Sequence, residues 1–280
     1  MKTVSSLATT TRVCLAAGGP VVLVPTMGAL HHGHGTLIRR ARRLAGKEGL
    51  VVVSIFVNPK QFGPQEDFAR YPRPFLADRK LCEQAGADLL FHPSAEAMYP
   101  EGHSTIVDEL DLSLTLCGAA RPGHFRGVCT VVLKLFLITR PKIAVFGLKD
   151  FQQCAVIRQM VRDLHVPVRI VCVPTARESD GLAISSRNRF LSPEERAQSV
   201  ILHQALNEVR GAFEQGEVRA VKLEKILMGA ISRAPLARLD YASIADATTL
   251  RPVAKVGPNT VIALAVFFGK TRLIDNLQIL

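Results

Sequence analysis

The sequence predicts an α/β fold in two parts, a parallel sheet flanked by helices in residues 1–175 and a smaller α+β domain in residues 176–280. Short apolar runs alternate with helix-forming segments in the first part, and this alternation stops after about residue 175. Strands that alternate with helices indicate a parallel sheet covered on both faces. Hydrophobic residues form 48% of the chain and charged residues 21%, a globular composition that excludes a disordered protein.

The elements of the first part follow from local patterns. Short runs rich in Val, Ile and Leu predict buried strands at 21–24, 50–57, 87–91, 143–146 and 168–173. Helix formers and apolar residues at helical spacing predict helices after the first strand to about residue 45, and over 78–85, 127–139 and 151–164. This order is typical of a doubly wound, Rossmann-like sheet.

The second part opens with a strong helix start at Ser192-Pro193-Glu194-Glu195, where Ser is the cap, Pro occupies the first turn and Glu follows three residues after Ser. We expect this helix to run to about residue 216. A second helix is expected over 221–232, and strands are expected over 240–244 and 260–267. These elements predict the smaller α+β domain.

The charge of the chain indicates an anionic partner. Lys and Arg number 35 and Asp and Glu 24, so the formal net charge is +11, which nucleic acid, a membrane surface or a phosphorylated small molecule would match. No apolar run reaches the length of a membrane helix or a signal-peptide core, so we expect a soluble, cytoplasmic protein. The six cysteines form no C-x-x-C pair, which argues against a zinc knuckle or a thioredoxin-type site.

A basic cluster on the first long helix leaves a nucleic-acid-binding module as an alternative. Arg39, Arg40, Arg42 and Arg43 could bind phosphates. Cations are also favourable in the last turns of any helix, and the chain has no Trp and only three Tyr on which bases could stack. The sequence therefore favours neither nucleic acid nor a membrane as the partner.

The first site candidate directly follows the first predicted strand and reads Pro-Thr-Met-Gly-Ala-Leu-His-His-Gly-His over residues 25–34. Ligands of open α/β sheets bind at the carboxyl ends of strands, and the amides at a helix start favour phosphate. His31 and His34 would share one face of a helical turn and could donate hydrogen bonds to phosphate oxygens as their charge grows. His32 is expected to point elsewhere.

Two further candidates also follow predicted strands. Gln61 lies after the second strand, and its side chain offers a donor and an acceptor, which suits a substrate with hydroxyls and a carboxylate. Lys149 is a point charge suited to phosphate, and Asp150 could hold Mg²⁺ through water.

Two candidates lie in other loops. The segment 121–127, Arg-Pro-Gly-His-Phe-Arg-Gly, precedes a long apolar helix. Two hydroxyls and a guanidinium at Ser185, Ser186 and Arg187 form a plausible clamp for the β and γ phosphates of a nucleotide.

His-x-Gly-His resembles the signature of the nucleotidyltransferase superfamily. The motifs together, in this order and ending with Arg-Leu-Ile-Asp-Asn at 272–276, resemble the pantothenate synthetase family over almost the whole chain. The resemblance implies an ATP-dependent ligase that converts pantoate to pantoyl adenylate with release of pyrophosphate. The amine of β-alanine then attacks the acyl carbon to give pantothenate and AMP. It also implies Mg²⁺, a homodimer built on the amino-terminal domain, and a carboxyl-terminal domain that acts as a lid.

The same resemblance implies the roles of individual residues. His34 takes an acid role, His31 helps to hold the phosphates, and Lys149 and Arg187 complete the catalytic set. Gln61 and Gln153 bind pantoate, and Asp78 and Asp150 are candidates for Mg²⁺. The residues implied at the ATP site are Met27, Gly28, Ala29, Leu30, His31, His32, Gly33, His34, Gly147, Leu148, Lys149, Asp150, Val173, Ala176, Ile184, Ser185, Ser186 and Arg187.

Two positions depart from the family pattern. Cys117 and Leu148 stand where the family usually has Glu, so two negative charges are missing near the expected site. A weakened or inactive paralogue therefore stays open as an alternative. A nucleotidyltransferase that acts on a phosphorylated substrate is a second alternative, but Gln61 and Gln153 are neutral where such a substrate would attract Arg.

Overall fold

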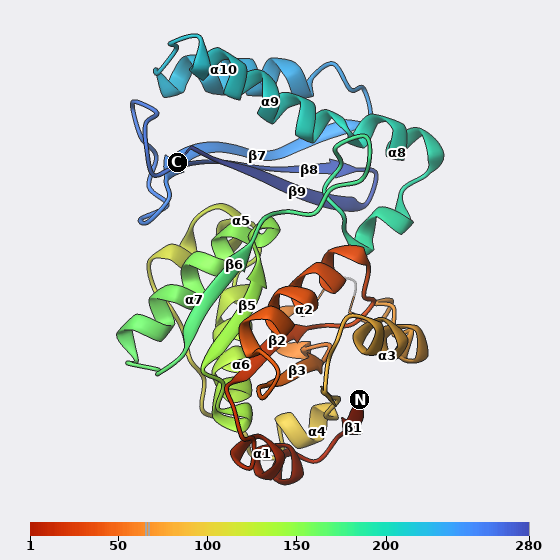
Figure 1. Cartoon of the computed structure of the whole chain (residues 1–280). Helices are drawn as coiled ribbons and strands as arrows, with labels where there is room; N and C mark the ends of the chain where they lie inside the picture. The colour runs from red at the N-terminus through yellow and green to blue at the C-terminus, as the bar shows by residue number, and fades with distance from the viewer. Residues whose placement is uncertain (65, 67, 280) are drawn as a thin grey trace.

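Two sheets organise the chain in a computed structural model that describes residues 1–64, 66 and 68–279 (Figure 1). The larger sheet has six strands in the order β1-β4-β3-β2-β5-β6, and every neighbouring pair is parallel. Its strands are β1 (Lys2–Val4), β2 (Val21–Thr26), β3 (Leu50–Ile55), β4 (Leu89–Phe91), β5 (Ile143–Gly147) and β6 (Arg169–Val173). The chain order reverses between β2 and β5, and such a switch point opens a crevice for a ligand.

Helices cover both faces of this sheet, which confirms the predicted α/β class. On one face α2 packs Ile38 and Ala41 against strand residues such as Val22, and on the other α6 and α7 pack against Leu23 and Phe146. The helices are α1 (Leu7–Leu15), α2 (His32–Ala45), α3 (Phe75–Gln84), α4 (Ala95–Met98), α5 (Leu116–Ala120), α6 (His124–Thr139) and α7 (Phe151–Asp163), with short 3₁₀ turns η1 (Pro59–Gln61), η2 (Leu112–Leu114) and η3 (Leu148–Asp150).

The smaller sheet is antiparallel, in the order β7-β8-β9. Its elements are η4 (Ser186–Phe190), α8 (Pro193–Ser199), α9 (Ile201–Glu214), α10 (Ala220–Ile231), β7 (Ala237–Asp246), β8 (Thr260–Phe268) and β9 (Thr271–Ile279). One face of the sheet packs against α9 and α10. Tyr241, Ala263 and Ile274 on the other face join the core of the first sheet. The smaller sheet is therefore held between its own helices and the end of the larger sheet (Figure 1).

The sequence was wrong about some elements. The helix expected from residue 193 to about 216 is divided at Val200 into α8 and α9, although Ser192 caps α8 as expected by accepting from the Glu195 amide. The third strand, β9, was not predicted, because its buried positions alternate with polar residues such as Arg272. Its segment 272–276 was interpreted only as a sequence motif. The expected boundary near residue 175 falls in the segment between β6 and η4.

One arginine of the basic cluster is part of the fold. Arg42 pairs with Asp88 at 2.7 Å and also donates to the carbonyls of Gly46 and Gly49 beyond the end of α2. Its charge therefore stabilises the turn between α2 and β3. Among the helices described, none is long and apolar enough to cross a bilayer.

Candidate active site

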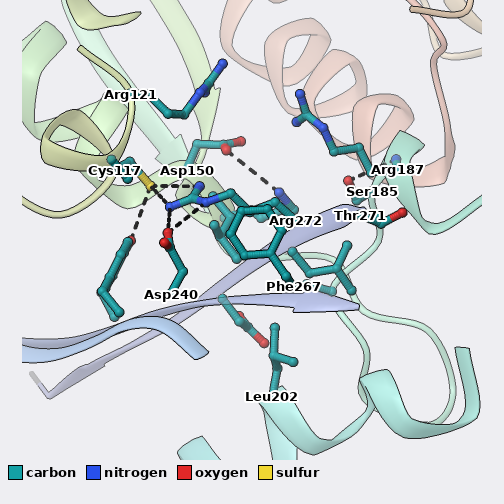
Figure 2. Close-up of a pocket in the computed structure, with 18 of the residues that line it drawn as sticks. Cys117, Arg121, Asp150, Ser185, Arg187, Leu202, Asp240, Phe267, Thr271 and Arg272 are labelled. Carbon is teal, nitrogen blue, oxygen red and sulfur yellow. Dashed lines mark hydrogen bonds and ion pairs between the residues drawn. The ribbon is translucent and has the colours of Figure 1, made fainter. Parts of the chain in front are cut away.

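The carboxyl ends of four parallel strands supply one cavity of about 240 Å³. Segments that follow β2, β3, β5 and β6 line it, together with residues 184–187 from the linker to the second region. A larger cavity of about 830 Å³ shares Lys149, Asp150 and Arg187 with it and extends to the smaller sheet. Figure 2 shows Arg121, Asp150 and Arg187 around this larger space, opposite residues of the smaller sheet.

Most of the residues expected at the site line the smaller cavity: Met27, His31, Gly33, His34, Gln61, Gly147, Lys149, Asp150, Gln153, Ala176, Ile184, Ser185, Ser186 and Arg187. His32 is exposed and lines neither cavity, as expected for the middle histidine. Val173 is buried in the core between the sheet and α2, and Leu148 is half-buried against the opposite core. None of His32, Val173 and Leu148 lines either cavity, and their expected contacts with a nucleotide stay predictions.

The Asp78 side chain supports the turn that follows β2. Gly28 (φ +84°) and Ala29 (φ +51°) both have left-handed backbones, which only glycine adopts freely. The Asp78 carboxylate accepts from the Ala29 amide at 2.8 Å and from the Leu30 amide at 2.7 Å. Asp78 is 1% exposed, and this burial raises its pKa despite the two hydrogen bonds. Both Asp78 oxygens support the turn, and Asp78 lines neither cavity, so its expected contact with Mg²⁺ stays a prediction.

The rings of His31 and His34 lie in contact at the start of α2, with centroids 4.1 Å apart and planes tilted by 43°. The backbone amide of His31 donates to His34 Nδ1 at 3.3 Å, so the His34 proton lies on Nε2. Burial first, then the charge of neighbours including Lys149, lowers the pKa of His34 to about 3 and that of His31 to about 4. Both rings are therefore neutral near neutral pH, and His34 Nε2 is a fixed hydrogen-bond donor.

Gln61 is held in place by a buried polar network. Asn58 Nδ2 donates to Gln61 Oε1 at 3.1 Å and to the Gly127 carbonyl at 3.0 Å, and the Tyr99 hydroxyl donates to Asn58 Oδ1 at 2.8 Å. Gln61 Nε2 points to the sulfur of Met27, 2.9 Å away. The amide oxygen of Gln61 is therefore occupied by Asn58, and its NH₂ group points to Met27, which lines the cavity.

The sequence interpretation missed Asn58 and Tyr99. The Asn58-Pro59 pair is a typical start of a helical turn, and the Asn58 side chain does accept from the Lys60 amide. That signal could have identified Asn58. Tyr99 lies 41 residues away in sequence, and no local pattern indicates its contact.

The segment 121–127 supports the backbone of Gln61. Arg121 forms an ion pair with Glu66 and donates to the Gln61 carbonyl at 3.3 Å, and His124 Nδ1 lies 2.9 Å from the same oxygen. Gly127 has no room for a side chain, because an added Cβ would lie 2.3 Å from the Lys60 carbonyl oxygen. This close approach brings α6 against η1, so the motif positions Gln61 in addition to lining the cavity.

Cations gather where η3 and residues 184–187 meet. Lys149 Nζ lies 3.7 Å from Asp150 Oδ1, and the amide of Arg187 donates to Ser185 Oγ at 3.2 Å. Among the described residues, Asp150 is the acidic side chain that lines the smaller cavity beside these cations. In the described part of the chain, no three His, Cys, Asp or Glu side chains form a cluster that could hold a metal by themselves.

The two departures from the family pattern have different surroundings. Cys117 Sγ lies 3.2 Å from the Tyr241 hydroxyl and 3.5 Å from a guanidinium nitrogen of Arg272, and Arg272 pairs with Asp240 at 2.8 Å (Figure 2). The cation opposite Cys117 therefore has a carboxylate partner on β7, which β8 separates from β9 in the sheet. The side chain of Leu148 packs against the core cluster of the first sheet.

Comparison with known proteins gives consistent matches over the whole chain. A family model for pantoate–β-alanine ligase matches residues 1–278. A pantothenate synthetase of Heliobacterium modesticaldum is 54% identical over 262 residues, which cover 94% of this chain and 92% of that protein. A pantothenate synthetase of Syntrophotalea carbinolica is 50% identical over 283 residues, which cover 100% of this chain and 99% of that protein.

Solved structures match both sheets together. A pantothenate synthetase from Thermus thermophilus has a TM-score of 0.94 and 48% identity, with 99% of each chain covered. A pantoate–β-alanine ligase from Francisella tularensis, complexed with beta-gamma ATP and β-alanine, has a TM-score of 0.82 and 33% identity, with 99% of this chain and 97% of that chain covered.

The buried neutral histidines predict acid sensitivity. The pKa of His34 falls from 6.5 to about 3 on folding, so protons bind the unfolded chain more tightly. The stability that the neutral His34 ring contributes is therefore fully present above about pH 6.5. It is lost as the pH falls toward 3, by about 1 kcal/mol per pH unit. We expect the slope of Tm against pH below 6.5 to be smaller in His34→Asn than in the wild type.

His32→Asn is the matched control, because His32 is exposed, and it should keep the wild-type slope. Thermal unfolding followed by circular dichroism over this pH range measures the effect. An unchanged slope in His34→Asn would contradict a buried, neutral His34.

Proposed function

This chain belongs to the pantoate–β-alanine ligase family, and from that premise we propose which of its residues carry out the ATP-dependent joining of pantoate to β-alanine. The observation that carries the proposal is that four strand ends and the 184–187 segment meet at one cavity. The same cavity is lined by glutamine side chains, which suit a substrate with a carboxylate and hydroxyls, and by imidazole, ammonium and guanidinium groups, which suit a polyphosphate.

The chemistry needs positioning and charge stabilisation more than a protein nucleophile. A carboxylate oxygen of pantoate bonds to the α-phosphorus of ATP while the bond to the β-phosphate oxygen breaks and pyrophosphate leaves. The amine nitrogen of β-alanine then bonds to the acyl carbon, AMP leaves, and the amine loses a proton. Oxide is a poor leaving group, so adenylation makes the second step possible. The enzyme must hold two anions together and stabilise the charge that develops on pyrophosphate.

We assign pantoate to the side of the cavity where Gln61 and Gln153 lie. Asn58 occupies the Gln61 oxygen, so the Gln61 NH₂ group is the part of its amide that can donate to a carboxylate or a hydroxyl. Neutral amides suit pantoate, because a phosphorylated substrate would call for a cation at this place. This argues against the alternative nucleotidyltransferase.

We assign the phosphates of ATP to the imidazole and cationic groups of the cavity, His31, His34, Lys149 and Arg187. His34 donates from Nε2 to an oxygen on which negative charge develops, as a neutral imidazole whose orientation is set by the His31 amide. This is the form we propose for the expected acid role of His34. Lys149 and Arg187 supply the positive charges of this group.

Mg²⁺ fits the donor set only as a partner of ATP. Asp150 is the carboxylate that lines both cavities beside the cations, and Mg²⁺ is commonly bound by one or two carboxylates together with substrate phosphates and waters. We propose that Asp150 holds the ion, which would neutralise phosphate charge. Lys149, 3.7 Å away, keeps this carboxylate beside the phosphate site.

We propose that the carboxyl-terminal region acts as the lid of the site. The larger cavity extends from Lys149 and Asp150 to residues of β7 and β9, so the smaller sheet forms one wall of the space in which the adenylate would lie. A wall of this kind keeps water from a reactive acyl adenylate. The homodimer and the cytoplasmic location implied by the family stay predictions, and light scattering on purified protein tests the former.

His34→Ala should lower the rate of pantoate-dependent pyrophosphate release by about 10²-fold, because one fixed donor to the developing charge is lost. The rate is measured with ATP, Mg²⁺ and pantoate in the absence of β-alanine. The exposed neighbour offers a control, and His32→Ala should keep the wild-type rate. A near-normal rate in His34→Ala would sink the assignment.

Gln61→Ala should raise the KM for pantoate by about 10- to 10²-fold, because a hydrogen bond to a charged substrate is lost. The KM for ATP should stay within about threefold, since the phosphates are assigned to other side chains. Steady-state kinetics with each substrate varied separately give both values, and exposed Gln84→Ala is the control. Equal losses for pantoate and ATP would contradict the assignment.

The weakened or inactive paralogue is tested by restoring the family residues. We expect Cys117→Glu with Leu148→Glu to change kcat by less than about twofold, because Arg272 already has Asp240 as its carboxylate partner. AMP release with all substrates present measures kcat. An increase of about tenfold or more would show that the two neutral residues weaken the enzyme.

A further inference from the structure

A single side-chain amide joins the smaller sheet to the catalytic turn of the larger one. Asn276 lies on β9 and is 8% exposed. Its Nδ2 donates to the carbonyl of Leu148 at 2.9 Å and to the carbonyl of Lys149 at 3.0 Å. These two carbonyls belong to consecutive residues of η3, the turn that follows β5 and carries Lys149 and Asp150 into the cavity.

The position of Asn276 is itself fixed by buried charges. Its backbone amide donates to Asp275 Oδ1 at 2.8 Å, and Asp275, whose side chain is 1% exposed, accepts from two nitrogens of Arg177 at 2.6 and 3.0 Å. Arg177 also donates to the Gly181 carbonyl at 3.0 Å. The bidentate pair ties β9 to the segment that follows β6, so Asn276 reaches η3 from a rigid support.

The turn η3 depends on such an outside partner. A 3₁₀ turn of three residues satisfies few of its own backbone groups, so the carbonyls of this half-buried turn gain an outside donor in Asn276. Leu148 is anchored by its side chain in the core, but Lys149 extends its side chain into the cavity and has no comparable apolar anchor. The Asn276 amide therefore fixes the backbone orientation from which the Lys149 ammonium is aimed.

We infer that Asn276 is a positioning residue that couples docking of the smaller sheet to the placement of Lys149 in the active site. The inference rests on the proposed function, because Lys149 is assigned there to the phosphates of ATP. Asn276 also lines the larger cavity, but it is assigned no contact with a substrate. It acts on adenylation through Lys149. When the smaller sheet docks on the larger one, the same contact places the Lys149 ammonium for reaction.

The test compares Asn276→Ala with Asn207→Ala. Asn207 lies on α9 in the same region and contacts His203 and Arg210 of its own helix, so it reports the loss of an amide that does not reach η3. We expect Asn276→Ala to lower first-turnover pyrophosphate release by about 10- to 10²-fold, because a small displacement of a catalytic group has effects of this size. The KM for pantoate should stay within about twofold, because Gln61 and Gln153 lie on other elements.

A double-mutant cycle separates positioning from general stabilisation. In a Lys149→Ala background the Asn276→Ala change should cost little further rate, because its route to the reaction has been removed. If the rate losses of the two single variants multiply in the double variant, the inference is overturned. An Asn276→Ala enzyme with a wild-type rate would overturn it as well. Asn276→Asp offers the carbonyls no donor and should behave like Asn276→Ala, so a wild-type rate in that variant also overturns it.

Failure of the proposed function gives a different result. A wild-type protein that released no pyrophosphate in the presence of ATP, Mg²⁺ and pantoate would overturn the function and this inference together. An active wild type with an unaffected Asn276→Ala variant overturns only the inference. Tm is measured for every variant, and a rate loss in Asn276→Ala with the Tm of Asn207→Ala supports the coupling.

Discussion

The carboxylate of Asp78 under the turn after β2 fixes much of the site. Two successive left-handed residues would be costly for Ala29 without support, and the two amide hydrogen bonds to Asp78 hold them. The turn decides where α2 begins, and so it decides that His31 precedes the first turn of the helix and His34 lies within it. A helix started one residue later would turn His34 away from the switch point between β2 and β5.

Three of the groups assigned to substrate, His34, Gln61 and Lys149, share a second property: each is oriented by a backbone amide or by a buried side-chain amide. The His31 amide occupies His34 Nδ1, Asn58 occupies the Gln61 oxygen, and Asn276 holds the carbonyls of η3. Each of these contacts leaves a donor directed toward the cavity. Such preorganisation lowers the cost of orientation during the reaction and does not require the substrates to order the site.

The sequence predicted the parallel sheet and most of the cavity residues, because strand ends of a parallel sheet must meet at one edge. It did not predict the supports, because Asn58 to Tyr99 and Asn276 to Lys149 are contacts between distant segments with no local pattern. Asp78 was expected at a metal for the same reason: its residue type is visible in the sequence, but its two amide partners are 48 and 49 residues away. The strand β9 was lost because polar residues alternate along it.

The two histidines differ in what a proton would cost them when an anion binds. A polyphosphate opposes the effect of Lys149 and favours the charged imidazole, so it raises the pKa of both rings. In His34 a second proton must go to Nδ1, where it would displace the His31 amide that now donates there. In the proposed arrangement His34 therefore stays a neutral donor, and His31, whose Nδ1 has no hydrogen-bond partner among the described residues, is the ring able to take up charge. The spacing of His-x-Gly-His would then give the phosphates one fixed and one titratable contact from the same turn.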